Sequence, residues 1–249
     1  MNKCYIYLTI MIAVVVVIGA GCAETAVAPS GSDSGSVEAP KDSMRMGNTS
    51  GCDHAYFPLR EGYSVTFASP VEGFGDAGYT MTVTDSSDHT ATLDYDFTQG
   101  DTIFNQELEC KDGQIRALSY FNGAGAVSFD VETVSAEGEI LPADLGPGKE
   151  WTSTYEIVMK STDPNMPESL RNFNASVTMQ RKALGEEEVT VPAGTYTALQ
   201  VETVVDFAME TEFPIDFGYE GTEYWVKGVG LVKSVAGEIQ SEAVSITLP

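Results

Sequence analysis

The fold of this chain is decided by a stretch of strict alternation, Thr90-Ala91-Thr92-Leu93-Asp94-Tyr95-Asp96-Phe97, in which every second side chain is apolar. Side chains on a β-strand point to alternate faces, so this period of two indicates a strand with one buried and one wetted face. The same period recurs over residues 79–84, 151–159 and 199–205. No long segment has a convincing helical period, so we expect little helix.

Short polar turns separate the alternating segments, among them Asp85-Ser86-Ser87-Asp88, Lys111-Asp112-Gly113 and Asn122-Gly123. Such short connections favour antiparallel pairing of consecutive strands. The sequence therefore predicts an all-β fold, an antiparallel curved sheet built as a sandwich or half-barrel.

A spaced pattern occurs twice: Leu59-x-x-Gly62-x-x-Val65-Thr66 is repeated as Leu145-x-x-Gly148-x-x-Trp151-Thr152. It predicts two related β-meander halves, 56–138 and 139–249, although four matching positions can also arise by chance. Either half alone would expose a broad apolar sheet face, so we expect a single domain over residues 52–249.

The amino-terminal segment is typical of an export signal. Met1-Asn2-Lys3 is basic, Cys4–Ile18 is an almost unbroken apolar run, and Gly19-Ala20-Gly21-Cys22 closes it. This arrangement predicts a signal peptide over residues 1–21 and lipidation of Cys22, and it resembles the lipobox of prokaryotic lipoproteins. Gly19 departs from that pattern, which has a Leu-like residue at this place.

Two alternatives remain for this segment: an uncut membrane anchor, and ordinary secretion without a lipid. All three readings place the body of the protein outside the cytoplasm. The lipoprotein reading places it on the cell membrane or the outer membrane, with the membrane as a partner through its anchor.

Residues 22–51 are predicted to be a flexible tether, because they are rich in Ala, Ser, Gly and Pro and contain no aromatic residue. Asn48 and Asn174 each begin a triplet that fits the glycosylation acceptor pattern, which matters only in an organism that glycosylates.

The chain is strongly acidic, with a net charge of −24 from 37 acidic and 13 basic residues. Such a surface repels phosphate backbones, which argues strongly against binding of nucleic acid. Its hydrophobic content of 43% is ample for a sizeable core.

Two cysteines, Cys52 and Cys110, lie in the predicted domain. Cysteines in an oxidising compartment often pair, so we expect a disulfide between them; two unpaired buried thiols are the alternative.

Motifs for catalysis or cofactor binding are missing. Cys52-x-His54 could be part of a metal site, but further ligands at a recognisable spacing are absent, and His89 lies in a polar turn. The sequence contains neither a Gly-x-Ser-x-Gly elbow nor a nucleotide-binding glycine pattern. Asp94 and Asp96 could hold a cation or serve glycoside chemistry, but a wetted sheet face is the simpler reading. We expect no catalytic residue, no cofactor and no metal.

Three segments resemble a family of exported proteins: Tyr56-Phe57-Pro58-Leu59-Arg60-Glu61-Gly62, Val189–Val201 with its core Val191-Pro192-Ala193-Gly194-Thr195-Tyr196, and Tyr224–Lys233. They look like motifs of the uncharacterised DUF3108-like or TapB-like family, and the resemblance runs from about Tyr56 to Gly237. Val65 stands where that family often has Trp. The resemblance implies a curved antiparallel sheet of exported type and no established catalytic residues.

The same motifs have a structural reading. Pro192 and Gly194 suit a tight hairpin with a bulge, and Gly228 and Gly230 suit a close backbone approach or another bulge. We therefore interpret these four residues as fold-specifying turn positions.

The leading functional hypothesis is a non-enzymatic, lipid-anchored binding or scaffold domain of the cell envelope, whose partner is an apolar small molecule or an envelope protein. Aromatic residues on the inner face of a curved sheet could enclose an apolar ligand. The alternatives are an extracytoplasmic glycan hydrolase that uses two carboxylates, and a surface assembly partner that uses a strand edge. The aromatic candidates are Tyr95, Phe97, Trp151, Tyr155, Phe207, Phe213, Phe217, Tyr219 and Trp225.

Overall fold

The structure is a computed structural model. It describes residues 52–71, 75–98, 103–120, 123–124, 129–161, 163, 168, 171–211 and 215–249. The predicted signal peptide, Cys22, the tether, Asn48 and Phe213 lie outside the described residues, so the predictions made for them stay predictions.

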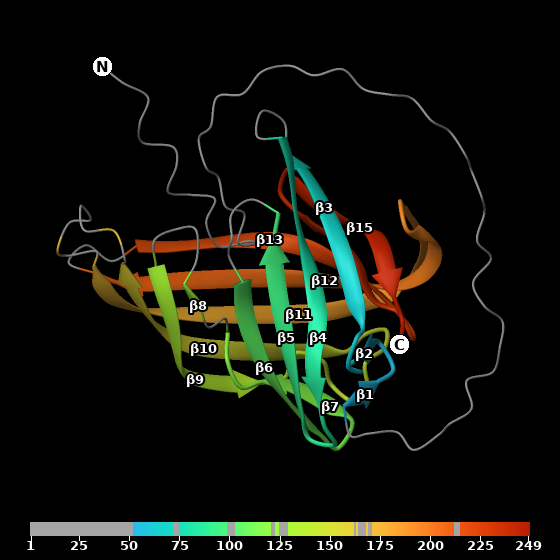
Figure 1. Ribbon diagram of the computed structural model, residues 1–249, viewed down its shortest axis with the longest axis horizontal. Coiled ribbons are helices and arrows are strands. Elements are labelled where there is room, and N and C mark those ends of the chain that lie inside the picture. Colours follow the sequence, from blue (N-terminus) through green and yellow to red (C-terminus); the bar gives the residue numbers. More distant parts are fainter. Residues whose placement is uncertain are drawn as a thin grey trace.

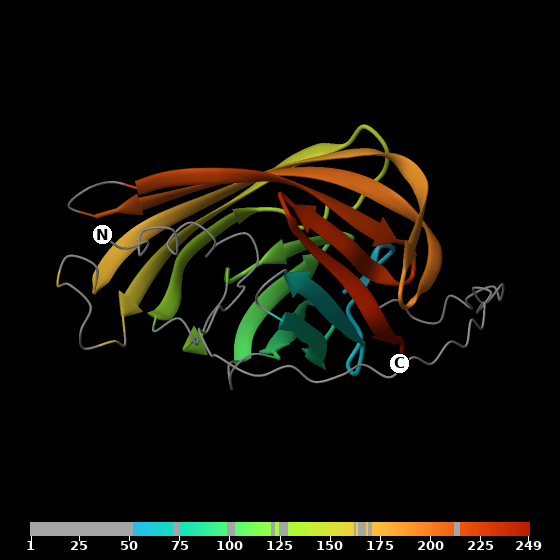
Figure 2. The same ribbon diagram turned by 90° about the horizontal axis from the view of Figure 1, so that it is seen from above.

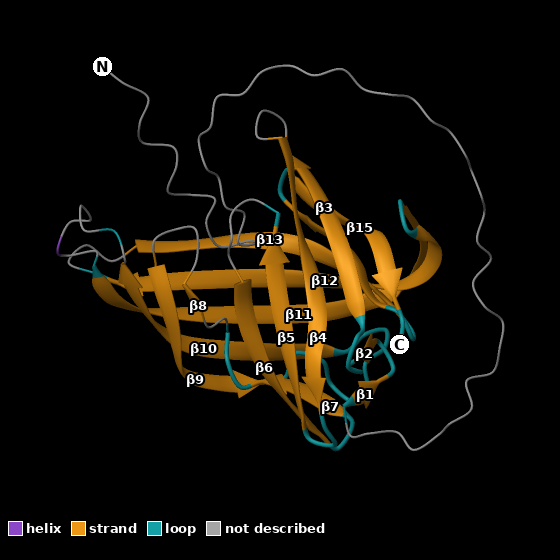
Figure 3. Ribbon diagram, in the orientation of Figure 1, coloured by secondary structure: helices purple, strands orange, loops and turns teal. Residues whose placement is uncertain are grey.

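Strands account for most of the described chain (Figure 3). In chain order they are β1 (Asp53–His54), β2 (Phe57–Pro58), β3 (Ser64–Val71), β4 (Gly75–Ser86), β5 (Thr90–Phe97), β6 (Ile103–Lys111), β7 (Gln114–Ala117), β8 (Gly123–Ala124), β9 (Phe129–Gly138), β10 (Glu150–Ser161), β11 (Asn172–Val191), β12 (Gly194–Glu210), β13 (Ile215–Val226), β14 (Gly230–Ala236) and β15 (Ile239–Thr247).

One antiparallel 13-stranded sheet contains β3 to β15, in the order β7-β6-β5-β4-β3-β15-β14-β13-β12-β11-β10-β9-β8. All but one of its strand pairs join strands that are consecutive in the chain. The exception is the pair between β3 and β15, the first and last strands of the sheet. The all-β, antiparallel, curved fold is thus confirmed.

The sheet folds over on itself, so that β3–β6 cross in front of the long strands β9–β13 (Figure 1). Figure 2 shows the long strands arching over the others. Strands of two face-to-face layers that cross steeply form an orthogonal packing, and their inner faces make a common core. The largest fully buried side chains are Tyr63, Phe67, Leu59, Leu93, Leu108, Ile115, Leu141, Leu199, Val65, Val83, Val177 and Val201.

The two edges of the sheet are β7 and β8, and β7 contacts the chain that follows β9. Ile115 of β7 forms an isolated bridge with Leu141, which follows β9. Ile115 N donates to Leu141 O at 2.9 Å, and Ile140 N donates to Ile115 O at 2.8 Å. Arg116 Nε adds a bond of 3.3 Å to Gly138 O. We call this contact the seam; it nearly closes the sheet into a ring.

The repeated sequence pattern corresponds to a repeated structure. Gly62 and Gly148 both have a φ of 85°. Gly62 N donates to Val83 O at 3.0 Å, and Gly148 N donates to Ala183 O at 2.7 Å. In both partner strands, β4 and β11, the register shifts just beyond the accepting residue. The equivalence of the two turns supports the prediction of two related halves, which here share one sheet.

A disulfide joins Cys52 to Cys110 and ties the start of the described chain to β6. In the chain-entropy model a cross-link over a separation of 58 residues stabilises the fold by about 4 kcal/mol. The predicted pairing is present in the structure.

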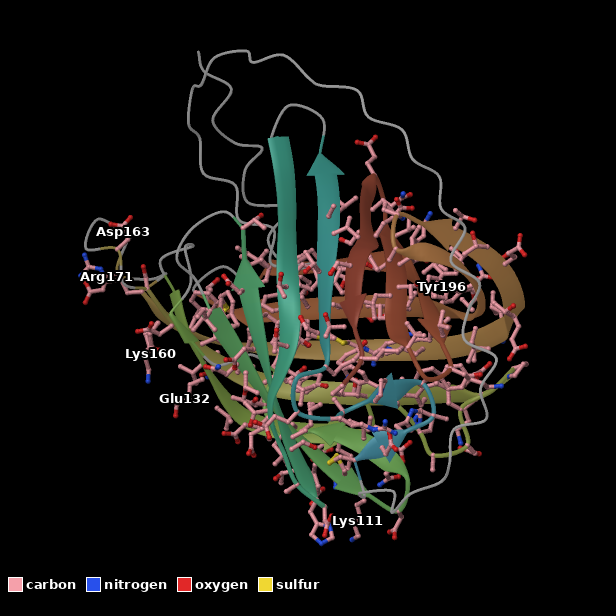
Figure 4. All side chains as sticks on the ribbon, turned by 45° about the vertical axis from the view of Figure 1, so that its right-hand side comes forward. Lys111, Glu132, Lys160, Asp163, Arg171 and Tyr196 are labelled. Carbon is pink, nitrogen blue, oxygen red and sulfur yellow. A yellow bond between two sulfur atoms is a disulfide. The ribbon has the colours of Figure 1, made fainter. Side chains whose placement is uncertain are left out.

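The predicted turn residues lie at strand ends. Pro192 and Ala193 form the loop between β11 and β12, and Tyr196 (Figure 4) donates its hydroxyl to Ala193 O at 2.9 Å. Val191 pairs directly with Gly194, so the prediction of a bulge at this hairpin is wrong. The register of β11 against β12 shifts earlier in the strand, between Ala183 and Glu186.

Gly228 lies two residues before β14 and Gly230 is its first residue, and they have positive φ values of 74° and 110°.

On the outer surface, cross-strand ion pairs are common; Lys160 Nζ, for example, lies 2.8 Å from Glu132 Oε2 (Figure 4). Exposed pairs of this kind contribute little stability.

Candidate functional site

Two opposite charges lie on the inner face of the long strands. Arg181 of β11 shares this face with Val177 and Met179, and Glu223 of β13 shares it with Trp225. The side chains of Arg181 and Glu223 are only 10% and 21% exposed, and 3.9 Å separates Nε from Oε2. Burial of a charge is costly unless it is paired, so this ion pair needs further partners.

Neighbouring side chains supply part of that requirement. Arg181 Nη1 donates to Ser153 Oγ at 3.1 Å, and Nη2 lies 3.1 Å from Met179 Sδ, a weak acceptor. Trp225 Nε1 donates to Glu223 Oε2 at 2.9 Å. The distance of 3.9 Å between Arg181 and Glu223 is too long for a hydrogen bond, so they are not bonded to each other directly.

Thr203 of β12 lies between the two charges. Its register partners are Arg181 on one side and Gly221 on the other. Thr203 is 5% exposed. Its hydroxyl oxygen, Oγ1, is buried and has no hydrogen-bond partner among the described residues. Such an orphan hydroxyl costs free energy and calls for an explanation. We call Ser153, Arg181, Thr203 and Glu223 the polar row.

Tyrosines from both layers lie near the polar row. Four of them interact electrostatically with Arg181 or Glu223, and the fifth, Tyr95, interacts with two of these four. They are Tyr79 of β4, Tyr95 of β5, Tyr120 after β7, Tyr155 of β10 and Tyr219 of β13. The rings of Tyr120 and Tyr155, from opposite layers, lie 5.1 Å apart.

Burial raises the pKa of all five of these hydroxyls. That of Tyr219 rises to about 12, with the carboxylate of Glu223 as a second cause. Near neutral pH these groups are therefore uncharged hydrogen-bonding groups.

Beyond the polar row the inner face becomes apolar but is not fully covered. Met159, Met209 and Phe217 point inward by strand alternation, yet each is only half-buried. At the other end of the same face, Leu199 and Val201 are completely buried. The inner face thus offers a partly accessible apolar surface that ends at a buried polar row, an arrangement that suits binding of an amphiphilic molecule.

The aromatic residues proposed from the sequence lie on this inner face, apart from Phe213, which lies outside the described residues. Trp151 is the register partner of Arg181, and Trp225 binds Glu223. Phe97 and Phe207 are buried in the core. Tyr95, Tyr155, Phe217 and Tyr219 belong to the surface described above.

Sequence reasoning missed Arg181 and Glu223. The signal was available, because each is a charged residue at an apolar-face position of an alternating strand. Thr203 was assigned to the correct face, but a sequence cannot show that its hydroxyl lacks a partner.

The other candidates lie away from this site. Asp94 and Asp96 belong to β5, where Asp96 is exposed and Asp94 Oδ1 accepts a bond of 2.5 Å from Asn105. His89 is exposed in its turn. No group of three or more His, Cys, Asp or Glu in the described part of the chain could hold a metal ion.

His54 is buried in a structural role. Its Nδ1 accepts a bond from Tyr56 N, so Nε2 carries the proton and donates to Pro142 O at 3.1 Å. Cys52, which we considered as a metal ligand together with His54, forms the disulfide with Cys110.

Comparison of the sequence with known proteins finds one matching family. The sequence model of the DUF3108-like family matches residues 78–248. Among curated proteins, none matches the chain. No helix in the described ranges is both long and apolar enough to cross a membrane.

Two crystal structures have a similar fold. One is a predicted exported protein with a YmcC-like fold from Bacteroides fragilis, with 16% identity and a TM-score of 0.56; the match covers 78% of this chain and 100% of that one. The other is a predicted lipoprotein from Parabacteroides distasonis, with 16% identity and a TM-score of 0.51, covering 78% of this chain and 99% of that one. Identity this low shows the shared fold alone.

Proposed function

The chain belongs to the DUF3108-like family, and from this premise we propose that it is an extracytoplasmic envelope protein that binds an apolar ligand on the inner face of its sheet. In this proposal residues 1–21 are an export signal, Cys22 carries the lipid, and residues 22–51 tether the domain to the membrane. The proposed role is binding, without catalysis.

The observation that carries the proposal is the half-buried apolar part of the inner face, at Met159, Met209 and Phe217. Methionine side chains are flexible and polarizable, which suits contact with hydrocarbon chains of varied shape. A core without a ligand would gain stability from closing over Met159, Met209 and Phe217, because each buried apolar side chain stabilises a fold by about 1.5 to 3 kcal/mol.

Binding can be tested with the full chain in lipid nanodiscs and the fluorescent probe N-phenyl-1-naphthylamine, with empty nanodiscs as background. Phe217→Ser should weaken probe binding severalfold, because it removes an aromatic contact from the inner face. Asp216→Ser, at the next position and on the outer face, is the matched control. Wild-type protein that binds no more probe than empty nanodiscs would contradict the proposed binding role.

Anchoring is tested separately by growing expressing cells with radiolabelled palmitate. The wild-type chain should incorporate label and lose residues 1–21, and Cys22→Ser should incorporate none. An uncut, unlabelled wild-type chain in the membrane fraction would favour the membrane-anchor reading instead.

Glycan hydrolysis by two carboxylates receives no support from the described residues. Asp94 and Asp96 lie together on the outer face of β5, and the inward carboxylate of Glu223 accepts a hydrogen bond from Trp225 and lies 3.9 Å from Arg181.

A further inference from the structure

We propose that Arg181 and Thr203 bind the carboxylate head group of a long-chain fatty acid, whose hydrocarbon chain lies along the inner face of β11–β13. This inference rests on the proposed binding function and specifies its ligand. Its basis is an excess of hydrogen-bond donors at one end of an apolar surface.

The guanidinium of Arg181 has more N–H groups than acceptors around it. Each of its terminal nitrogens carries two N–H groups, and in each case one is used, by Ser153 Oγ or by Met179 Sδ. One N–H on each nitrogen therefore has no acceptor among the described residues. A pair of terminal N–H groups is the geometry that a carboxylate accepts through both oxygens.

The hydroxyl of Thr203 is a second group in need of an acceptor. It is buried and unpartnered, and it lies on the strand next to Arg181 in direct register with it. The position opposite it on β13 is Gly221, which has no side chain to offer an acceptor. A ligand oxygen held by Arg181 would give this hydroxyl the acceptor that the protein itself does not supply.

An apolar surface continues from the polar row along the inner face. On β13 the inner face runs from Gly221 through the half-buried Tyr219 and Phe217 to Ile215, a length of about 20 Å at the rise of a β-strand. Their register partners on β12 are Val205 and Phe207, which are buried, and the half-buried Met209. A hydrocarbon chain that starts at the polar row can therefore lie on apolar side chains along its length.

Charge sets the expected strength of this contact. Glu223 offsets part of the charge of Arg181, and the neighbouring tyrosine hydroxyls are neutral, so a bound carboxylate depends on hydrogen bonds as well as on charge. A fatty acid should therefore bind better than its uncharged methyl ester, which has the same chain but a weaker acceptor.

The test compares laurate with methyl laurate on the full chain in lipid nanodiscs. The two tryptophans of the chain both adjoin the polar row, so their fluorescence reports binding directly. Wild-type protein should bind laurate at least tenfold more tightly than methyl laurate, since bonds between charged groups are the strong ones. Arg181→Met should abolish that preference.

Thr203→Val is the decisive variant, because it is nearly isosteric and separates the ligand role from a purely structural one. It should weaken laurate binding about tenfold and leave methyl laurate less affected. At the same time it should raise the midpoint of thermal unfolding without ligand, because the orphan hydroxyl is removed. Thr178→Val, the same change on the outer face of β11, is the control for both readouts.

The outcomes separate the two proposals. If both probes bind equally and Thr203→Val changes neither, the head-group site is overturned while the binding function stands. If neither probe binds, both are overturned. Because Thr203→Val does not unpair a charge, it keeps the test valid even if Arg181→Met fails to fold.

Discussion

At the scale of single residues, Gly230 illustrates how close packing selects an amino acid. Tyr63 donates its hydroxyl to Val229 O at 2.6 Å, and this hydroxyl occupies the place where a Cβ on Gly230 would lie. The φ of 110° at Gly230 is also one that residues with a Cβ rarely adopt.

Gly230→Ala should therefore lower the free energy of unfolding by about 3 kcal/mol, from backbone strain and the clash with Tyr63 together. Gly185→Ala is the matched control, because a Cβ at Gly185 meets nothing within 4 Å and its φ is not in the strained range. Urea unfolding measures both. Equal stabilities of the two variants would contradict the packing argument.

His54 predicts a pH dependence of stability. Burial lowers its pKa below 6.5, although the bond to Pro142 O acts in the opposite direction. The unfolded chain therefore binds a proton at a higher pH than the folded chain, so the free energy of unfolding should fall as pH drops below about 6.5. His54→Gln should flatten this dependence. A pKa of 6.5 or above for His54, measured by NMR titration of the folded protein, would refute the prediction.

Strand alternation shows which side chains face inward, and it assigned Trp151, Tyr155 and Thr203 to the inner face correctly. It did not lead us to Arg181 or Glu223, because we interpreted charged residues as part of the wetted face. Whether such a pair meets depends on the register of three strands, which the sequence of any one strand does not contain.

At the scale of elements, the two glycine turns that precede β3 and β10 repeat each other in φ and in hydrogen bonding. A Cβ on Gly148 would meet nothing within 4 Å, and one on Gly62 would meet only Pro249 Cβ at 3.9 Å. Steric contact therefore does not select glycine at these positions, and the backbone conformation does.

Gly62→Ala and Gly148→Ala should each cost about 1 to 2 kcal/mol of unfolding free energy, the penalty for a left-handed residue with a Cβ. Gly146→Ala, within the second turn but without a positive φ, should cost little. Thermal unfolding of the three variants measures this. A large difference between the first two would argue against equivalent turns.

Element positions were predictable where alternation is strict. The opening segment, Thr90–Phe97, is β5 residue for residue, and residues 151–159 lie within β10. The lengths of β11 and β12, 20 and 17 residues, were not foreseen. The polar stretch Glu186-Glu187-Glu188 of β11 stays in the sheet because β12 pairs with it throughout.

At the scale of the whole molecule, the seam between β7 and the chain after β9 is the weakest part of the ring. It relies on a few backbone bonds around Ile115, Ile140 and Leu141, whereas β11 and β12 pair along nearly their full lengths.

Hydrogen exchange of the full chain should therefore show that the amides of Ile115 and Ile140 exchange at least tenfold faster than that of Val205 in β12. Local opening at the seam breaks fewer contacts than opening within the long strands. Equal protection at the three amides would mean that the ring opens only by global unfolding.

The pairing of β3 with β15 was beyond sequence reasoning, because no turn joins them and their contact spans nearly the whole domain. It has a kinetic consequence. During synthesis β15 emerges after every other strand of the sheet, so until then β3 presents an unpaired edge that could pair with another chain. The newly made protein should thus be most prone to aggregation, and most dependent on chaperones, in the interval before its final strand arrives.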